Sequence, residues 1–196
     1  MENKFTNRQE EIIIAATKRI DESGIQELTI KNLAADIGLS EAGLYRHFKS
    51  KNDILLGVLN YFIFKMNTRL NGIMSEEYDS SSALLQALFV SQLNAFEENP
   101  SIISVVFSEG IFQFNKQLTA RVSDMMDVMQ SKIELIIQNG QENNEFNKLV
   151  GVKSTTTIIM GSMRLIVLKW KLSGHQSNLI KDGNKVLTGL LKMLSK

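Results

Sequence analysis

The stretch that decides the fold runs from Thr29 to Lys51 and reads TIKNLAADIGLSEAGLYRHFKSK. It contains two short segments with apolar residues at helical spacing, separated by Gly38-Leu39-Ser40. A tight turn between two crossed helices needs a residue that accepts a positive φ, and Gly38 supplies it. Ala34 lies four residues earlier, where a small side chain lets the two helices approach. The pattern therefore predicts a helix-turn-helix motif.

A generic helical hairpin is an equally good interpretation of the Ala-x-x-x-Gly spacing taken alone. The residues after the turn favour a DNA-binding motif, because no acidic residue lies between Ala42 and Asn52. The side chains of this interval that suit phosphate contacts form one cluster: Tyr45, Arg46, His47, Lys49 and Lys51. Phosphate contacts supply most of the affinity for DNA and position a protein on it.

Helical periodicity continues on both sides of this motif, and the alternating polarity typical of strands is missing. We expect about nine helices, at residues 8–23, 30–37, 41–48, 51–74, 83–98, 101–112, 116–139, 153–172 and 178–194. The polar segments 75–82 and 138–149 are expected to be loops. The single proline, Pro100, fits the first turn of a helix. The sequence therefore predicts an all-α protein.

The composition is ordinary for a globular protein, because 43% of the 196 residues are hydrophobic and 22% are charged. Cysteine is absent, which excludes disulfides and thiolate metal sites. The N-terminus lacks the apolar core of a signal peptide. The most apolar stretch, residues 158–172, contains three basic residues and falls short of the roughly 20 apolar residues of a membrane span. We therefore expect a cytoplasmic protein with no membrane partner.

Residues 8–59 strongly resemble the tetracycline-repressor (TetR) family of regulators, because spacing and residue type agree across four consecutive expected helices. The matching residues are Ile12-Ile13-Ile14-Ala15-Ala16, Gly24, Leu28-Thr29-Ile30, Leu33-Ala34, Gly38-Leu39-Ser40, Gly43-Leu44-Tyr45, His47-Phe48 and Ser50-Lys51. The remainder of the chain matches the family only in length and helix count. The resemblance implies a three-helix DNA-binding domain at residues 1–50 and a helical ligand-binding and dimerisation domain at residues 51–196.

The resemblance also implies that the helix at residues 41–48 enters the major groove of DNA, which is wide enough to admit a helix. Arg46 is a candidate for a bidentate pair of hydrogen bonds to guanine. The residues on or near the groove-facing side of this helix are Ala42, Gly43, Tyr45 and Arg46.

Contacts to the DNA backbone are implied for several further positions. In the family, the residues aligned with Tyr45, His47 and Lys51 usually touch phosphate. Thr29 would present its hydroxyl and nearby backbone N–H groups to a phosphate at the start of a helix. Lys31 is a candidate for a base or backbone contact.

Glu41 departs from the family pattern, because many members carry a basic or amide residue at this position. A carboxylate repels phosphate, yet it is able to accept a hydrogen bond from cytosine N4. It also favours the N-terminus of a helix, and this second role is the interpretation that we prefer. The departure bears on base specificity and not on the fold.

The last two expected helices form a candidate dimer interface. The helix at residues 153–172 is apolar nearly all round and must be covered on more than one side. The resemblance implies a homodimer in which both helices pair with their copies, while the alternative is that both belong to an internal core. The candidate interface residues are Thr157, Gly161, Leu165, Leu168, Leu187, Leu190, Leu191 and Leu194.

The remaining helices are expected to enclose a pocket for a small hydrophobic or amphipathic ligand. Methionine side chains adapt to varied ligands. A stripe of methionine and aromatic side chains at helical spacing is, however, also typical of an ordinary core. Glu109 and Arg164 would orient a ligand or lie on the surface. The candidate ligand-binding residues are Phe89, Leu93, Phe96, Phe107, Ile111, Phe114, Met125, Met129, Met163 and Trp170.

The expected function is a DNA-binding transcriptional regulator that binds a palindromic double-stranded operator as a homodimer. Release of the DNA by a ligand is the usual arrangement in the family, and activation is the alternative. Neither a cofactor nor a metal is expected.

The sequence argues against one other class of function and leaves a second as the alternative. The sequence contains no GxGxxG, P-loop, HExxH or Gly-x-Ser-x-Gly motif, and it has two histidines, so we do not expect an enzyme. A helical protein–protein adaptor without sequence-specific DNA binding is the alternative. It would explain the number of helices but not the basic cluster after the turn.

Overall fold

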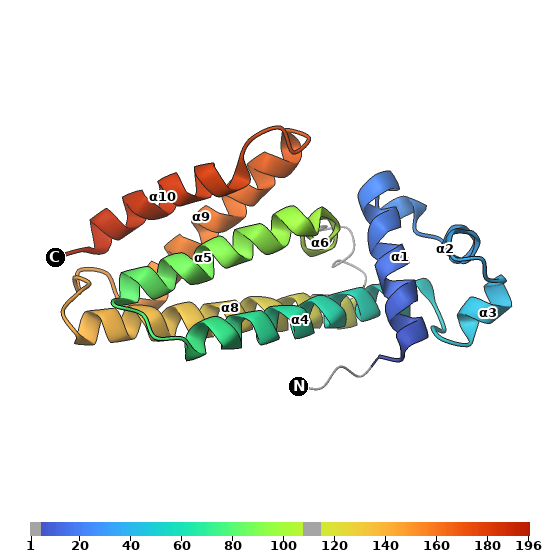
Figure 1. Cartoon of the computed structure of the whole chain (residues 1–196), viewed down its shortest axis with the longest axis horizontal. Helices are drawn as coiled ribbons and strands as arrows, with labels where there is room; N and C mark the ends of the chain where they lie inside the picture. The colour runs from blue at the N-terminus through green and yellow to red at the C-terminus, as the bar shows by residue number, and fades with distance from the viewer. Residues whose placement is uncertain (1–4, 108–114) are drawn as a thin grey trace. The chain divides into compact units, whose positions relative to one another are not determined.

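The computed structural model describes residues 5–107 and 115–196 of the chain (Figure 1). Within these residues it contains nine α-helices, one 3-10 helix and no strand beyond an isolated bridge between Phe146 and Ser195. The elements are α1 (Asn7–Ser23), η1 (Ile25–Glu27), α2 (Ile30–Asp36), α3 (Glu41–Tyr45), α4 (Lys51–Ser75), α5 (Ser81–Glu98), α6 (Pro100–Val106), α8 (Lys116–Glu142), α9 (Val152–Leu172) and α10 (Leu179–Leu194). The prediction of an all-α protein is confirmed.

Two predicted helix ends were wrong. Helix α3 ends at Tyr45 instead of Phe48, because the amides of His47 and Phe48 both donate to the carbonyl of Leu44 and tighten the last turn. Helix α8 continues to Glu142, three residues beyond the predicted end at Asn139 and into the segment 138–149 that was expected to be a loop. The predicted helix 101–112 begins one residue earlier than expected, and its residues 108–112 lie outside the described residues.

The extension of α8 has a tertiary cause. The ring of Phe146 is 1% exposed and packs on Gly140, and the amides of Glu145 and Phe146 both donate to the Gly140 carbonyl at 2.9 Å. The chain therefore turns back on the end of the helix and buries a large side chain there. The polar composition of segment 138–149 did not predict this turn, because most side chains around Phe146 are polar.

By its internal contacts the chain divides into two compact units. The first comprises Met1–Asn67 and Asn99–Met125, and the second comprises Thr68–Glu98 and Met126–Lys196. Helices α4 and α8 each contribute residues to both units. The domain boundary predicted between residues 50 and 51 coincides with the start of α4 and stays a prediction.

The first unit is built around α1. The hydroxyl of Thr6 accepts a hydrogen bond from the Gln9 amide, and the Gln9 side chain returns to the Thr6 amide, so that the helix begins with a capping box. Helices α2 and α6 pack against α1. A Cβ at Gly57 of α4 would lie 3.0 Å from the Phe48 ring and 3.4 Å from Ile13, so the glycine allows close packing at this point.

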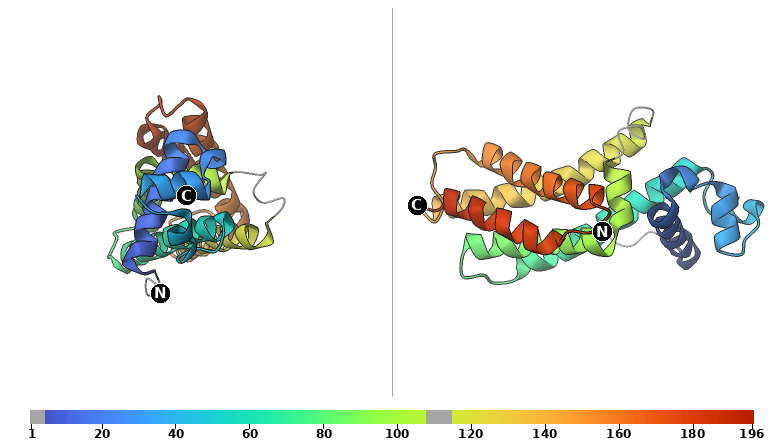
Figure 2. Two further views of the ribbon diagram at one scale, coloured as in Figure 1. Left: turned by 90° about the vertical axis from the view of Figure 1, so that its right-hand side faces the viewer. Right: turned by 90° about the horizontal axis from the view of Figure 1, so that it is seen from above.

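The second unit is a bundle in which α10 lies along α5 and α9 (Figures 1 and 2). Gly183 of α10 permits this approach, because a Cβ there would lie 2.1 Å from the Leu93 side chain. The Glu145 carboxylate accepts hydrogen bonds from the amides of Ser81 at 2.7 Å and Ser82 at 2.8 Å and thereby caps α5. Among the described helices, none is long and apolar enough to cross a membrane.

Candidate nucleic-acid interface

The turn between α2 and α3 has the geometry that the sequence predicted. Gly38 adopts a φ of 64°, which confirms the expected positive φ. The Leu39 amide donates to the Ala34 carbonyl at 2.9 Å, and the Gly38 amide donates to the Ala35 carbonyl at 3.3 Å. These two bonds satisfy carbonyls at the end of α2 and fix the direction in which the chain leaves it.

Both short helices of the motif begin with a side-chain cap. The Thr29 hydroxyl accepts from the Asn32 amide at 3.1 Å, and the Ser40 hydroxyl accepts from the Gly43 amide at 3.1 Å. Helices of seven and five residues are too short to be stable alone, so caps and packing must hold them. Leu33 and Leu44 supply the packing, because both are fully buried.

Helix α3 presents one face to solvent and the opposite face to the core. Leu44 and Phe48 are buried, with exposed fractions of 0% and 6%. The exposed residues recur at helical spacing and form the surface that we call the α3 face: Glu41, Ala42, Tyr45 and Arg46. Gly43 is half-buried under the Ser40 cap. The structure therefore places three of the four predicted groove-side residues, Ala42, Tyr45 and Arg46, beside Glu41 on an exposed helix face of the first unit.

The predicted phosphate contacts differ in their surroundings. Thr29 and Lys31 are exposed at the start of α2, and Tyr45 is 48% exposed on α3. His47 is half-buried, and its carbonyl accepts a hydrogen bond from the Gln9 side chain at 3.3 Å. This bond joins the start of α1 to the end of α3, two points 38 residues apart in the chain.

Lys51 has a structural contact that sequence reasoning missed. Its ammonium group donates to the carbonyl of Ile25 in η1 at 3.1 Å. Burial lowers the pKa of Lys51, and the nearby Glu27 carboxylate opposes this shift. An ammonium group has three N–H donors, so two remain for a phosphate. No local signal predicted the bond, because its partners are 26 residues apart.

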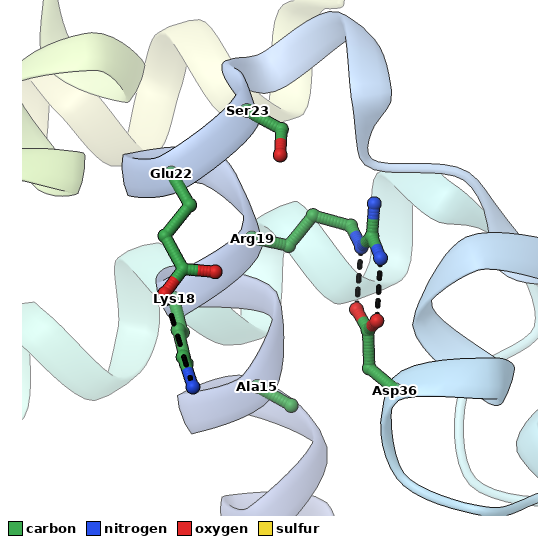
Figure 3. Close-up of a pocket in the computed structure, with 6 residues that line it drawn as sticks. All are labelled: Ala15, Lys18, Arg19, Glu22, Ser23 and Asp36. Carbon is green, nitrogen blue, oxygen red and sulfur yellow. Dashed lines mark hydrogen bonds and ion pairs between the residues drawn. The ribbon is translucent and has the colours of Figure 1, made fainter.

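A bidentate ion pair between Arg19 of α1 and Asp36 of α2 holds the motif to the first helix (Figure 3). The hydrogen bonds from Arg19 hold the pKa of the Asp36 carboxyl below its usual range. The pair borders a small pocket of about 190 Å³ on the first unit, lined by Ala15, Lys18, Arg19, Glu22, Ser23 and Asp36.

The predicted dimer residues lie on α9 and α10 of the second unit and differ in exposure. Thr157, Gly161 and Leu165 are exposed, and Leu165 reaches 58%. Leu187 is a correction: its side chain is 1% exposed inside its own unit and offers no surface to a partner. The remaining four are half-buried: Leu168, Leu190, Leu191 and Leu194.

Three strongly exposed apolar residues on these helices are not among the predicted interface residues. Ile158 is 50% exposed, Leu172 is 77% exposed and Met193 is 75% exposed. Ile158, Leu165 and Leu172 are separated by seven residues each, and this regular spacing was the signal that could have identified them. We call the exposed apolar residues of the two helices the α9–α10 stripe: Ile158, Leu165, Leu172, Val186 and Met193.

The predicted ligand-binding residues are mostly core in the isolated chain. Phe89, Leu93, Phe96, Met129, Met163 and Trp170 are buried in the second unit, with exposed fractions between 0% and 8%. In the first unit Met125 is buried and Phe107 is half-buried. Ile111, Phe114 and Glu109 lie outside the described residues, and Arg164 is exposed.

A second described pocket, of about 560 Å³, lies on the second unit. Its lining is polar and contains none of the predicted ligand-binding residues: Glu76, Tyr78, Asp79, Ser80, Ser81, Leu84, Asn139, Asn143 and Glu145. The half-buried Arg69 of α4 is a further polar group that sequence reasoning did not select.

Comparison with known proteins agrees with this geometry. Residues 12–58 match the family described as bacterial regulatory proteins, tetR family, and residues 57–193 match the C-terminal region of YsiA-like protein. The nucleoid occlusion factor SlmA of Idiomarina loihiensis is 35% identical over 141 residues, which are 70% of each chain.

Two solved structures show the same fold. A TetR transcription regulator from Haloarcula marismortui superposes with a TM-score of 0.85 at 17% identity, over 98% of this chain and 100% of the other. The regulator FadR from Bacillus subtilis, in complex with stearoyl-CoA, superposes with a TM-score of 0.79 at 19% identity, over 95% and 98%.

Proposed function

The chain belongs to the TetR family of bacterial DNA-binding transcription regulators, and we propose that it is a cytoplasmic, ligand-released repressor that binds a palindromic operator as a homodimer. Its family consists of regulatory proteins and not of enzymes. We further propose that residues 1–50 bind DNA and that residues 51–196 bind the ligand and the second copy.

The observation that carries this proposal is the α3 face. Its exposed residues stand on a helix whose turn, cap and buried side are all fixed by contacts within the first unit. A rigid exposed helix of this kind is suited to the major groove. Arg46 would read a guanine, while Tyr45, Thr29 and Lys31 would contact the phosphate backbone.

The proposed homodimer rests on the α9–α10 stripe. Exposed apolar side chains on neighbouring helices are costly in water and favour burial against a second surface. A twofold dimer would place two α3 helices about one DNA turn apart, ~34 Å, and would match a palindromic site.

The proposed ligand is hydrophobic or amphipathic, because the proposed ligand-binding region, residues 51–196, is rich in buried aromatic and methionine side chains. FadR from Bacillus subtilis shares the fold and was solved with stearoyl-CoA, which supports the same class of ligand by analogy. One conformation of the dimer would bind the operator and another would not. A ligand that binds the second conformation more tightly would shift the population away from the DNA-bound state.

The deciding experiment measures DNA binding by fluorescence anisotropy with the DNA upstream of its own gene, at two salt concentrations and with random competitor DNA. Arg46→Glu should abolish specific DNA binding while the fold is retained. Arg121→Glu, which changes an exposed arginine of α8, should leave specific DNA binding unchanged. If neither this DNA nor selection from a random library yields an enriched site, the regulator is excluded in favour of the adaptor.

Nucleoid occlusion is a second candidate function, because SlmA of Idiomarina loihiensis is 35% identical over 70% of both chains. A deletion strain separates the two candidates. Septa placed across the nucleoid would support nucleoid occlusion. Changed transcript levels next to the bound sites, with normal septum placement, would support the repressor.

A further inference from the structure

Arg69 places a positive charge between α4 and α5 within the second unit. Its Nη1 donates to the Ser91 hydroxyl at 2.6 Å, and its Nη2 donates to Oε1 of Gln92 at 2.7 Å. Gln92 is only 7% exposed and lies on the buried face of α5, one helical turn from Phe89 and Phe96. A polar group therefore interrupts an otherwise apolar and aromatic helix face, and a cation faces it.

The two hydrogen-bond partners of Arg69 among the described residues, Ser91 and Gln92, carry no charge. Within residues 5–107 and 115–196, Arg8, Arg19 and Arg121 each pair with a carboxylate, whereas no carboxylate forms an ion pair with Arg69. Burial lowers the pKa of Arg69, and the carboxylate of Glu98 opposes this shift from a distance. Among these four arginines, the half-buried Arg69 is thus the one for which the described residues provide no directly paired carboxylate.

A cation in this position is costly for a purely structural contact. The free-energy cost of removing a charge from water is offset only by an opposite charge in excellent geometry, and neutral partners offset less of it. Methionine or glutamine would join the two helices without that cost. The guanidinium has five N–H donors, and the two described bonds use two of them, so donors remain for a further acceptor.

We infer that Arg69 binds the anionic head group of the effector, a carboxylate or phosphate attached to an apolar body. This inference rests on the proposed function in one respect: it takes the occupant of the helical unit to be the regulatory ligand. An arginine fork matches both head groups in geometry, and a charge-assisted hydrogen bond in a poorly hydrated site is strong. The apolar body is that of the hydrophobic or amphipathic ligand proposed above; Phe89 and Phe96, one helical turn from Gln92, are buried side chains of the same unit.

The test compares two probes that differ only in charge, decanoate and decan-1-ol, by isothermal titration calorimetry on the full chain. The wild type should bind decanoate at least about tenfold more tightly than decanol. Arg69→Met should remove this preference and leave the affinity for decanol within about twofold, because the apolar contacts remain. Arg121→Met, the matched control on an exposed ion-paired arginine, should change neither affinity.

A second variant protects the test against misfolding. Arg69→Met leaves the buried Gln92 without its donor, so Arg69→Met/Gln92→Leu replaces both partners with apolar side chains and should fold. It too should lose the preference for decanoate. Decyl phosphate, run alongside decanoate, identifies which head group binds more tightly.

Three results would overturn the inference: equal binding of decanoate and decanol to the wild type, an unchanged decanoate affinity in folded Arg69 variants, or no binding of any probe. The assay is independent of DNA. A chain that binds its operator but none of these probes would refute the anionic site alone, whereas decanoate binding through Arg69 without any DNA binding would refute the proposed regulator.

Discussion

The side-chain amide of Gln9 donates a hydrogen bond of 3.3 Å to the backbone carbonyl of His47, and the carbonyl oxygen of the same side chain closes the capping box of α1. One side chain thus links the beginning of the first helix to the end of the helix that carries the α3 face. The orientation of that face is coupled to α1 through the backbone of His47, by a residue that is not itself a proposed DNA contact.

Gln9→Glu separates the two roles of this side chain. The carboxylate keeps the acceptor for the capping box but loses the N–H donor to His47. The loss of one neutral hydrogen bond, ~0.5–1.5 kcal/mol, should weaken DNA binding by roughly twofold to tenfold. Thr6→Ala is the control, since it removes the cap and keeps the bond to His47. Equal DNA affinities of the two variants in anisotropy titrations would contradict the coupling.

The ion pair between Arg19 and Asp36 should make stability depend on pH in acid. The folded-state pKa of Asp36 is depressed, so its contribution is complete above the unfolded pKa of about 3.9 and is lost as the pH falls through the lower folded value. The wild type should therefore unfold at a higher temperature than Asp36→Asn at neutral pH. This difference between the two thermal midpoints should disappear in strong acid. A gap in thermal midpoints that stays constant down to the lowest pH would refute this assignment.

Gly38→Ala should destabilise the motif by ~1–2 kcal/mol, because an L side chain is strained at a φ of 64°. Space is not the cause, since a Cβ there meets nothing within 4 Å. Gly38→Asn should cost less, because asparagine tolerates the left-handed region. Denaturant unfolding of the three proteins measures the order, and equal losses for alanine and asparagine would point to a different cause.

Gly140→Ala tests the packing that extends α8. A Cβ there would lie 2.2 Å from the Phe146 ring, which is fully buried, so the variant should lose ~1–3 kcal/mol of stability. Gly72→Ala is the matched control on α4, where a Cβ meets nothing within 4 Å, and it should gain up to ~1 kcal/mol from helix propensity. Similar unfolding free energies of both variants would contradict the close contact.

Leu165→Glu should convert the proposed dimer into a folded monomer. Leu165 is 58% exposed in the isolated chain, so a carboxylate there is tolerated by the monomer and is buried only in a dimer. Leu187→Glu is the contrasting variant and should unfold the chain, because Leu187 is 1% exposed. Sedimentation and circular dichroism separate the cases; a Leu165→Glu protein that still sediments as a dimer would place the interface elsewhere.

The local geometry of the DNA-binding motif was predictable from sequence. A positive φ at Gly38 and the caps at Thr29 and Ser40 depend on residues three or four positions apart, which the chain displays directly. The α3 face follows from the same helical spacing. Helix ends were less predictable, because the last turn of α3 and the extension of α8 depend on where Phe48 and Phe146 are buried.

The sequence by itself determined that this chain is helical and where the turn between α2 and α3 lies, because those properties arise from contacts within a few residues. Only the tertiary structure decided that Leu187 is core while Leu165 is exposed, and that Arg69 donates hydrogen bonds to Ser91 and Gln92. The physical reason is that an amphipathic pattern specifies an apolar face but not the neighbour that covers it. That neighbour is set by the packing of helices far apart in the chain.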